Sequence, residues 1–455
     1  MNAESAVVLG IDTPIGLTVV RELGARGVLV HGIAHSNDGV GLHSRYLYRG
    51  YRRPLEDDAT VQLLNQIAER DRVRVLMAVG EQDIAFINRN TERLSSFARL
   101  VPDAERTALV LDKLAACTAA QRIGIDVPVT HEIRHATQID EIVESVSYPV
   151  VLKWRNPHTI ATDLARAHLP LLKAEYGYDA ATLRAALGRY ASIGTYPLVQ
   201  SYCPGYGLGQ MVFMHQGAAL LRFQHRRIHE WPPEGGLSTV CESLGLDCHA
   251  QLFEKSVALL RSLRWEGPAM IEYRHDPRTG RSVFMEINGR FWGSQPLAYH
   301  AGAHFAWYTY SVLGNGVEPP PVPCRIGITC RFLLPEMRRL LTILFRARTI
   351  QNKQLRFSRA AELWSFVSGF VRPRHCYYVF SWHDPLPCLM DLLCIAGKAS
   401  RRAVAQCRAW IPVRSPLAVR PSDPHGQPRS RATAHSVVDA TSSRTPVAGS
   451  TTAEP

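Results

Sequence analysis

Short apolar runs alternate with amphipathic stretches over the first hundred residues. Runs bounded by turn residues predict strands at 6–10, 28–33 and 73–79. Apolar residues spaced three or four positions apart predict helices at 17–25, 60–70 and 84–91. Strands that alternate with helices are typical of a parallel, doubly wound α/β sheet, so we expect a Rossmann-like unit that is complete by about Val101.

The turn after the first predicted strand lacks a dinucleotide-binding motif. Gly10 and Gly16 flank this turn with no glycine between them, so the spacing GxGxxG is not met. The second strand ends at Ala34-His35-Ser36, where that motif would have an acidic residue for the ribose. We therefore favour a structural Rossmann-like unit over an NAD site.

The pattern changes from Leu111 onward. Apolar residues at helical spacing predict a helix at 114–123, and short apolar runs predict strands at 149–154, 197–202, 209–215, 218–224, 269–273 and 282–287. The last four runs form two hairpin-like pairs, which favours an antiparallel sheet and an α+β fold. A helix-rich segment follows the prolines at 319–321. After about Pro412 large apolar side chains are too few to offset the entropy of ordering, so we expect a disordered tail.

The net charge of +12 belongs to one segment. The 455 residues include 52 basic and 40 acidic ones, of which 16 and 4 lie between Cys324 and Arg414. Residues 1–323 are nearly neutral, which excludes a protein that is basic throughout. In the basic segment arginines such as Arg338 and Arg346 lie among leucines, and we favour helices that pack on the body with arginines in solvent over contact with an anionic membrane. Aromatic residues are not interleaved with the arginines, so nucleic acid is not expected.

The cysteines and the apolar runs bear on location. Ten cysteines include no CxxC pair, and the N-terminus has no basic stretch before its first apolar run. No apolar run approaches about 18 residues, the length that would span a bilayer. We expect reduced thiols, neither a signal peptide nor a transmembrane helix, and a cytoplasmic protein.

Acidic side chains gather in the last predicted hairpin. The turn Asp276–Gly280 places Glu272 opposite Glu286, and facing carboxylates repel unless a cation lies near them. Asn288 and Arg290 follow at alternate positions and share one face of an extended chain with Glu286. Two carboxylates and an amide oxygen suit Mg²⁺, and the arginine could clamp a phosphoryl oxygen or a carboxylate. The alternative is an edge hairpin whose acidic residues lie there by chance.

Three further features carry candidate chemistry. Only six of the basic residues are lysines, and two of them, Lys113 and Lys153, open a helix and close a strand, where an ammonium could reach a phosphate. Taken alone, we favour the interpretation of each as a surface lysine. At 198–205 an apolar strand turns polar, which leaves backbone groups for an adenine edge. At 223–238 a strand with Arg227 runs into a Pro- and Gly-rich loop, which favours an anionic substrate over a merely solvated loop.

Taken in chain order, these features resemble the ATP-grasp superfamily, which includes biotin carboxylase, carbamoyl phosphate synthetase and D-alanine–D-alanine ligase. The resemblance covers roughly residues 6–315 and is strongest to the predicted carboxylate–amine ligases (carboligases) of that group. Glu-Ile-Asn-Gly-Arg at 286–290 matches the family's most specific motif, Glu-x-Asn-x-Arg, and Glu272 stands in the place of its upstream metal carboxylate.

The resemblance implies a mixed α/β and α+β architecture. A Rossmann-like N-terminal domain would precede an ATP-grasp fold, in which two α+β subdomains sandwich ATP, and a helix-rich C-terminal extension would follow. The implied boundaries are 1–105 for the first domain, 106–198 and 199–318 for the two subdomains, 319–412 for the basic extension and 413–455 for the tail. The first domain of family members usually does not bind the nucleotide, which agrees with the missing glycine motif.

The resemblance also implies a role for each candidate residue. Phosphate-binding residues would be Lys113 and Lys153, adenine-binding residues Gln200, Ser201 and Tyr202, metal ligands Glu272, Glu286 and Asn288, and acyl-phosphate contacts Arg290 and Arg227. One departure concerns the glycine-rich loop that family members commonly place over the phosphates. The corresponding segment here, Trp154–Leu169, has no glycine, so other residues of this segment serve instead or the lid is altered.

The implied activity is that of an ATP-dependent carboxylate–amine ligase. A substrate carboxylate would attack the γ-phosphate of ATP, and an amine or another nucleophile would capture the acyl-phosphate. The implied cofactors are ATP and Mg²⁺, or Mn²⁺ in its place, and a self-biotinylated carboxylase is not favoured because no Met-Lys-Met motif occurs. The alternative is a non-catalytic ATP-binding module that acts through its basic C-terminal segment. The sequence names neither the carboxylate, the nucleophile nor the oligomeric state.

Overall fold

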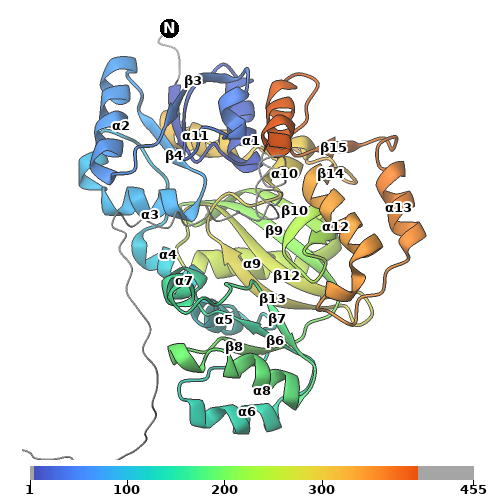
Figure 1. The fold of residues 1–455 in the computed structure, drawn as a ribbon. Helices are drawn as coiled ribbons and strands as arrows, with labels where there is room; N and C mark the ends of the chain where they lie inside the picture. The colour runs from blue at the N-terminus through green and yellow to red at the C-terminus, as the bar shows by residue number, and fades with distance from the viewer. Residues whose placement is uncertain (1–4, 398–455) are drawn as a thin grey trace, which may run out of the picture. The chain divides into compact units, whose positions relative to one another are not determined.

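The computed structural model describes residues 5–397, so the predicted tail at 413–455 lies outside them. These residues form one compact unit with three sheets (Figure 1). None of the described helices has the length and apolar character needed to span a membrane. Short 3₁₀ turns lie at Val40–His43, Glu92–Leu94, Ala136–Gln138, Ala191–Ile193, Leu246–His249 and Ala347–Thr349.

The first sheet confirms the predicted parallel α/β unit. Its four strands run in the order β3-β2-β1-β4 and all pair in parallel. The strands are β1 (Ser5–Leu9), β2 (Leu29–Ala34), β3 (Leu47–Arg52) and β4 (Val75–Ala78). The helices are α1 (Pro14–Gly24), α2 (Asp57–Asp71) and α3 (Glu81–Arg89). The edge strand β3 was not predicted, because its sequence LYRGYR has no apolar run.

A second sheet of four strands has the order β5-β8-β6-β7 and is antiparallel. Its strands are β5 (Thr130–His131), β6 (Val150–Lys153), β7 (Glu175–Gly177) and β8 (Leu198–Ser201). The helices of this region are α4 (Ala104–Leu111), α5 (Lys113–Arg122), α6 (Ile139–Ser145), α7 (Pro157–Arg166) and α8 (Ala180–Gly188). The strands predicted at 149–154 and 197–202 are confirmed as β6 and β8.

The third sheet has seven strands in the order β13-β12-β9-β10-β11-β14-β15. The strands are β9 (Tyr206–His215), β10 (Ala218–Trp231), β11 (Leu237–Ser243), β12 (Gly267–Asp276), β13 (Arg281–Asn288), β14 (Thr329–Arg331) and β15 (His375–Tyr377). Its helices are α9 (Ala250–Ser262), α10 (Gln295–Ala301), α11 (Phe305–Asn315), α12 (Leu333–Phe345) and α13 (Arg359–Ser368). The two predicted hairpins are confirmed as the antiparallel pairs β9–β10 and β12–β13.

The basic C-terminal extension is part of this body and not an appendage. Its strand β14 pairs with β11, and β15 pairs in parallel with β14. Asp384 is buried against the first sheet's helix α1, where its carboxylate lies 2.9 Å from Arg21 Nε and accepts a hydrogen bond from Ser44 Oγ. The favoured prediction, that the extension's helices pack on the body, is thus confirmed for the described residues.

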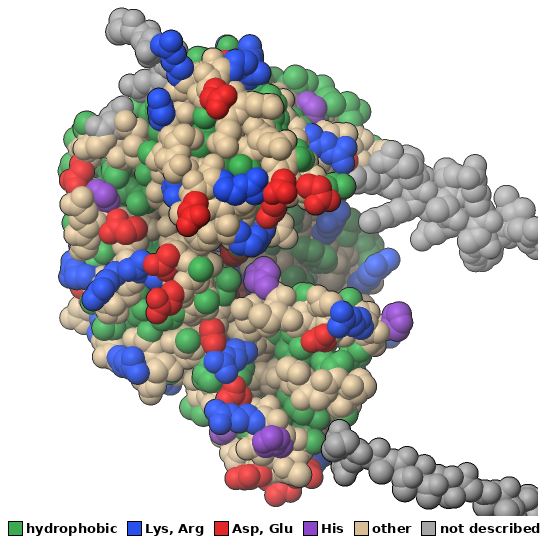
Figure 2. Space-filling model, turned by 90° about the vertical axis from the view of Figure 1, so that its left-hand side faces the viewer, with side chains coloured by type: hydrophobic (Ala, Val, Ile, Leu, Met, Phe, Trp, Pro, Cys, Tyr) green, Lys and Arg blue, Asp and Glu red, His purple; other side chains and the backbone are tan. Residues whose placement is uncertain are grey.

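Helices α10 and α11 connect the first and third sheets through a shared apolar core. Trp292, which precedes α10, meets Phe305 at the start of α11 edge to face at 4.8 Å between ring centroids. Both side chains belong to a cluster that includes Val8 of β1 and Phe223 of β10. On the face in Figure 2, basic and acidic side chains are interspersed, which agrees with the near-neutral charge of residues 1–323.

A buried carboxyl at this junction predicts a pH-dependent stability. Glu22 of α1 is fully buried, accepts a hydrogen bond from the backbone N–H of Trp307 at 2.7 Å, and burial raises its pKa to about 8. The folded state therefore binds more protons than the unfolded state between the ordinary pKa of 4.5 and about 8, so stability falls as the pH rises through this interval. Glu22→Gln keeps the acceptor without the charge. We expect the variant to match the wild type near pH 4.5 and to be more stable by a few kcal/mol above pH 8.

Urea denaturation of both proteins across this pH range measures the effect. The difference in free energy of unfolding between variant and wild type should grow with pH. Two stability curves that stay parallel would show that Glu22 does not titrate in this way.

Candidate functional site

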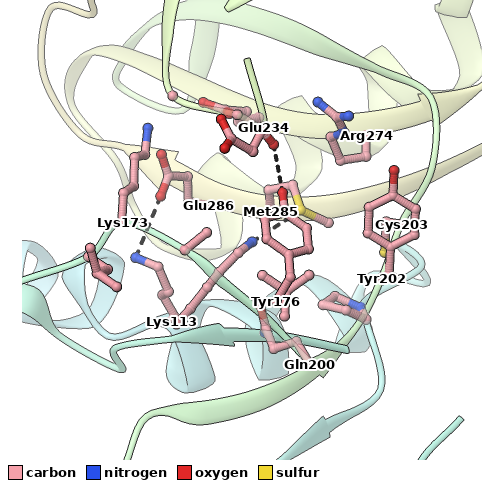
Figure 3. A pocket seen from close by; sticks show the side chains of 18 of the residues that line it. Lys113, Lys173, Tyr176, Gln200, Tyr202, Cys203, Glu234, Arg274, Met285 and Glu286 are labelled. Carbon is pink, nitrogen blue, oxygen red and sulfur yellow. Dashed lines mark hydrogen bonds and ion pairs between the residues drawn. The ribbon is translucent and has the colours of Figure 1, made fainter. Parts of the chain in front are cut away.

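A cavity of about 340 Å³ lies between the second and third sheets (Figure 3). Strands β6, β7 and β8 line one side of it, and β10, β12 and β13 line the other. The charged and polar lining side chains are Lys113, Lys153, Lys173, Tyr176, Gln200, Ser201, Tyr202, Arg227, Glu230, Glu234, Glu272, Arg274 and Glu286. Among the sequence-predicted residues, eight line this one cavity, and Asn288 and Arg290 do not.

The predicted carboxylate pair is in register. Glu272 of β12 is the direct cross-strand partner of Glu286 on β13. Each carboxylate has a protein cation nearby: Glu272 pairs with Arg227 at 2.5 Å, and Glu286 lies 3.5 Å from Lys113 Nζ. The expected cations near the facing carboxylates are thus protein side chains, and because they offset the repulsion, the pair does not by itself require a metal.

Glu286 remains ionised in this environment. Burial opposes the charged form, but the ammonium groups of Lys113, Lys173 and Lys153 outweigh burial and hold the pKa of Glu286 at about 2. Lys113 and Lys173 lie on either side of its carboxylate in Figure 3. A carboxylate that stays charged at every physiological pH suits the binding of a divalent cation.

Lys153 is a partly buried lysine on the β6 side of the cavity. It ends β6, and its Nζ lies 3.6 Å from the sulfur of Met285 on the opposite sheet. Burial lowers its pKa, although Glu286 raises it in part. An ammonium without a hydrogen-bonded carboxylate partner is available to an anionic ligand such as a phosphate.

The predicted adenine-binding residues follow β8. Gln200 is buried and donates to Thr130 Oγ1 at 3.0 Å, so its side chain is held by the neighbouring strand β5. The backbone N–H groups of Ser201 and Tyr202 donate to the carbonyls of Val129 and Pro149. These two N–H groups are therefore used by the sheet, and an adenine would have to bind other atoms of this segment.

Arg227 and Arg274 hold a second carboxylate at the cavity wall. Glu230 pairs with Arg227 and with Arg274, each at 3.0 Å, and Arg227 also pairs with Glu272. Burial disfavours the charge of Arg227, but Glu272 and Glu230 outweigh burial and raise its pKa. Of the three neighbouring basic residues on β10, only Arg227 lines the cavity. His225 is buried against Ser294, and Arg226 pairs with Glu242 at the surface.

Arg290 does not share the face of Glu286. Strand β13 ends at Asn288, so the alternation on which that prediction rested stops there. At Gly289 a Cβ atom would lie 2.3 Å from the ring of Trp265, so the chain turns at a position that only glycine fits. Arg290 then pairs with Glu81 at the start of α3, at 2.7 Å. Asn288 is in the strand and donates to Glu286 at 3.4 Å, just outside the cavity lining.

The segment without glycine is a helix. Residues 157–166 form α7, whose N-cap Asn156 accepts a hydrogen bond from the N–H of His158. Trp154 and Pro157, at the start of this segment, line the cavity. Asn156 and Pro157 are favourable residues for the start of a helix, and Ile160 and Leu164 provide its buried face. A helix thus lies where members of the resembled family commonly have a glycine-rich loop.

Sequence reasoning missed several lining residues. Lys173, Tyr176, Glu230, Glu234 and Arg274 all reach the cavity. Lys173 lies in the loop between α7 and β7, where no periodic pattern fixes the direction of a side chain. The scarcity of lysine was the available signal, because three of the six lysines in the chain line this cavity.

A segment of the C-terminal extension, Gln351–Lys353, contacts the rim of the cavity. Asn352 is buried and donates to the hydroxyl of Tyr202 at 3.3 Å, and the N–H of Gln351 donates to Glu234 at 2.6 Å. The hydroxyl of Tyr178 donates to the carbonyl of Gln351 and accepts from the N–H of Lys353. We call this segment the rim strap, because its hydrogen bonds connect Tyr202, just after β8, to Glu234 in the loop after β10.

The oxygen donors in and beside the cavity fit a hard divalent cation. Within residues 5–397 no group of three or more His, Cys, Asp or Glu side chains could hold a metal ion. A cation would therefore rely on Glu272, Glu286 and the amide oxygen of Asn288, with its other ligands from phosphate and water. Such an all-oxygen set with open positions suits Mg²⁺.

The arrangement of the second and third sheets, with a charged cavity between them, is that of the ATP-grasp fold. The N5-carboxyaminoimidazole synthetase of Staphylococcus aureus matches with a TM-score of 0.58 and 15% identity over 78% of this chain and 92% of its own. The L-amino acid ligase of Bacillus licheniformis matches with a TM-score of 0.53 and 16% identity over 70% and 78%. The biotin carboxylase of Campylobacter jejuni, solved as a β-γ-ATP complex, matches with a TM-score of 0.55 and 14% identity over 71% and 74%.

At these identities the likeness shows the fold of the chain. No protein-family model matches the sequence, and no curated protein matches it. The predicted resemblance to the ATP-grasp superfamily and the predicted fold class are therefore confirmed at the level of the fold.

Proposed function

We propose that the protein is an ATP-dependent ligase that activates a substrate carboxylate as an acyl-phosphate for attack by an amine or another nucleophile. The observation that carries the proposal is the facing pair Glu272 and Glu286 in a cavity that three lysines also line. Oxygen ligands for a divalent cation and ammonium groups for phosphates thus share one site. Phosphoryl transfer depends on positioning and charge neutralisation, which these groups supply. The fold, which ligases of this class share, also supports the proposed ligase activity.

In this proposal the lysines bind ATP and the arginines bind the reacting carboxylate. Lys113, Lys153 and Lys173 would neutralise the phosphates, and the segment Gln200–Tyr202 would lie along the adenine. The substrate carboxylate oxygen forms a bond to the γ-phosphorus while the bond from that phosphorus to the bridging oxygen breaks, which releases ADP. The nucleophile then attacks the acyl carbon and expels phosphate. Arg227, with Arg274 beside it, would hold the acyl-phosphate.

Mg²⁺, when bound, supplies neutralisation of the β- and γ-phosphates, and Glu272, Glu286 and Asn288 would hold it. Mn²⁺ accepts the same oxygen ligands. Arg290 has no direct part in this scheme, because its pair with Glu81 occupies it outside the cavity. The domain boundaries given above, a carbon–nitrogen ligase class and a cytoplasmic location belong to the same proposal, and the nine described cysteines, all free, agree with a reducing compartment.

An ATP-turnover screen tests the proposal. The full chain is incubated with ATP, Mg²⁺ and pooled carboxylic acids and amines, and phosphate release is measured. We expect release that depends on both pools and stops when a chelator removes the divalent cation. Mass analysis of the product then identifies the carboxylate and the nucleophile.

One observation favours the alternative, a non-catalytic ATP-binding module. Helix α7 stands where a mobile loop would close over the phosphates, and a lid that cannot move would leave ATP bound but unreacted. Tight ATP binding with no phosphate release from any pool would support this alternative over the ligase.

A further inference from the structure

Exposed apolar side chains concentrate in the C-terminal extension. Of the twenty-three large hydrophobic side chains that are exposed within residues 5–397, fourteen lie at or after Ile326. Phe345 is 77% exposed, Trp364 69% and Trp382 86%. Single exposed apolar residues are ordinary on a protein surface, but a concentration of this kind, with tryptophans, marks a contact surface.

An open groove runs along the outer side of helix α12. Met337, Leu341 and Phe345 are exposed at every fourth position, so they form one stripe along the helix. The inner side of the helix, which includes Leu340 and Ile343, is buried. A groove of about 450 Å³ follows the outer side, and its lining residues are Trp231, Arg338, Leu341, Thr342, Phe345 and Arg346. An arginine thus lies near each end of an apolar groove.

Helix α13 continues this character. Leu363, Trp364 and Val367 are exposed on one side of the helix. The opposite side faces the body, where Glu362 pairs with Arg339 of α12 at 2.7 Å and Phe366 lies 4.4 Å from the guanidinium of Arg331. Helices α12 and α13 lie side by side at the same edge of the molecule (Figure 1). We refer to their outer sides together as the α12–α13 surface.

The charges of the extension are sorted between inside and outside. Glu336, Glu362 and Asp384, three of its four described acidic residues, lie in buried or half-buried ion pairs, the first two with Arg339 and the third with Arg21. Seven exposed arginines have no carboxylate within 4.0 Å among the described residues. They are Arg338, Arg346, Arg348, Arg356, Arg359, Arg372 and Arg374. Three acidic side chains of the extension are thus neutralised in the interior. The outer surface of the extension therefore carries an excess of positive charge beside its exposed aromatic residues.

We propose that the α12–α13 surface docks on anionic lipid membranes, with Phe345 and Trp364 inserted at the headgroup level and the unpaired arginines bound to phosphate headgroups. In-plane amphipathic helices bind in this way, through buried apolar area together with electrostatic attraction to acidic lipids. A polyanion such as RNA would use the arginines but would leave the apolar stripe in water, and an acidic protein would need its own apolar ridge to fill the groove. A bilayer offers an apolar environment to the exposed aromatic side chains and phosphate headgroups to the arginines.

Vesicle sedimentation of the full-length protein tests the proposal. The vesicles are phosphatidylcholine alone, or equal parts of phosphatidylcholine and phosphatidylglycerol. We expect binding to the anionic vesicles that falls as salt is raised, and little binding to the neutral ones. The double variant Arg338→Glu/Arg346→Glu should lower binding to anionic vesicles by about thirtyfold or more, since each basic residue near such a surface contributes about fivefold. Phe345→Ser/Trp364→Ser should lower binding at high salt as well.

The matched control is Arg52→Glu/Leu55→Ser, which changes one exposed arginine and one apolar residue, 96% exposed, on the first domain. This control should bind as the wild type does, and thermal melts should show all variants folded. Absence of vesicle binding by the wild type would overturn the proposal, and so would binding that both surface variants retain, which would assign the contact to another part of the chain. A wild-type dimer that Phe345→Ser/Trp364→Ser turns into a monomer, without lipid binding, would make this surface an interface between copies. The readout is independent of ATP turnover, so its failure and that of the ligase proposal are distinguishable.

Discussion

Replacing Glu286 by glutamine should lower ATP turnover by about a hundredfold to a thousandfold, while the protein stays folded. Glutamine keeps the size of the side chain but removes the charge that faces Glu272 and that lies 3.5 Å from Lys113. A neutral amide oxygen binds Mg²⁺ more weakly than a carboxylate because it brings no negative charge, and the three cavity lysines would lose their shared counter-charge. Because the pKa of Glu286 is about 2, its ionisation should contribute no pH dependence in the physiological range.

Phosphate release and calorimetric titration with Mg²⁺-ATP together measure this effect. Glu254→Gln is the matched control, because Glu254 is an exposed carboxylate that pairs with Arg222 on the surface of the third sheet. The control should retain full turnover. Undiminished turnover in Glu286→Gln would remove the facing carboxylates from the proposed chemistry, whereas loss of turnover in both variants would indicate general damage.

The second large effect concerns stability. Arg21→Ala should lower the free energy of unfolding by about 3–5 kcal/mol, because it leaves the carboxylate of Asp384 buried without its cation. The side chains of Arg21 and Asp384 are 6% and 1% exposed, and Arg21 also donates to the backbone carbonyl of Asp384 at 2.9 Å. This contact attaches the C-terminal extension to helix α1, so its loss should also loosen the extension.

Urea denaturation measures the change, with Arg184→Ala as the comparison. Arg184 pairs with Asp140 and Glu144, but all three side chains are largely exposed, and such pairs contribute at most about 1 kcal/mol. Limited proteolysis of the extension gives a second readout. A loss of stability no larger for Arg21→Ala than for Arg184→Ala would show that the buried pair does not anchor the extension.

The parts of the fold that the sequence predicted are those in which apolar residues are consecutive or regularly spaced. The hairpin of β12 and β13 is the clearest case, since its turn chemistry set the register that brings Glu272 opposite Glu286. Strand β11 was missed because it buries Ser238 and Thr239 within a short mixed sequence, and β14 has only three residues. Periodicity carries no information on such strands.

The candidate site was predictable where residues are fixed to regular elements. Lys113 and Lys153 stand at a helix start and a strand end, and both reach the cavity. Arg290 was misplaced because strand alternation was extended past Asn288, and its partner, Glu81 of α3, lies more than two hundred positions away in the sequence. Contacts between distant segments follow from tertiary packing, which spacing along one chain cannot show.

The rim strap has a thermodynamic consequence for the two proposed binding sites. Asn352 belongs to the connection between α12 and α13, and its hydrogen bond ends on Tyr202, beside the proposed adenine position. If a ligand shifted Tyr202, this hydrogen bond would pass the shift to the connection between α12 and α13. Such coupling is reciprocal: the factor by which bound ATP alters affinity for a membrane is the factor by which the membrane alters affinity for ATP.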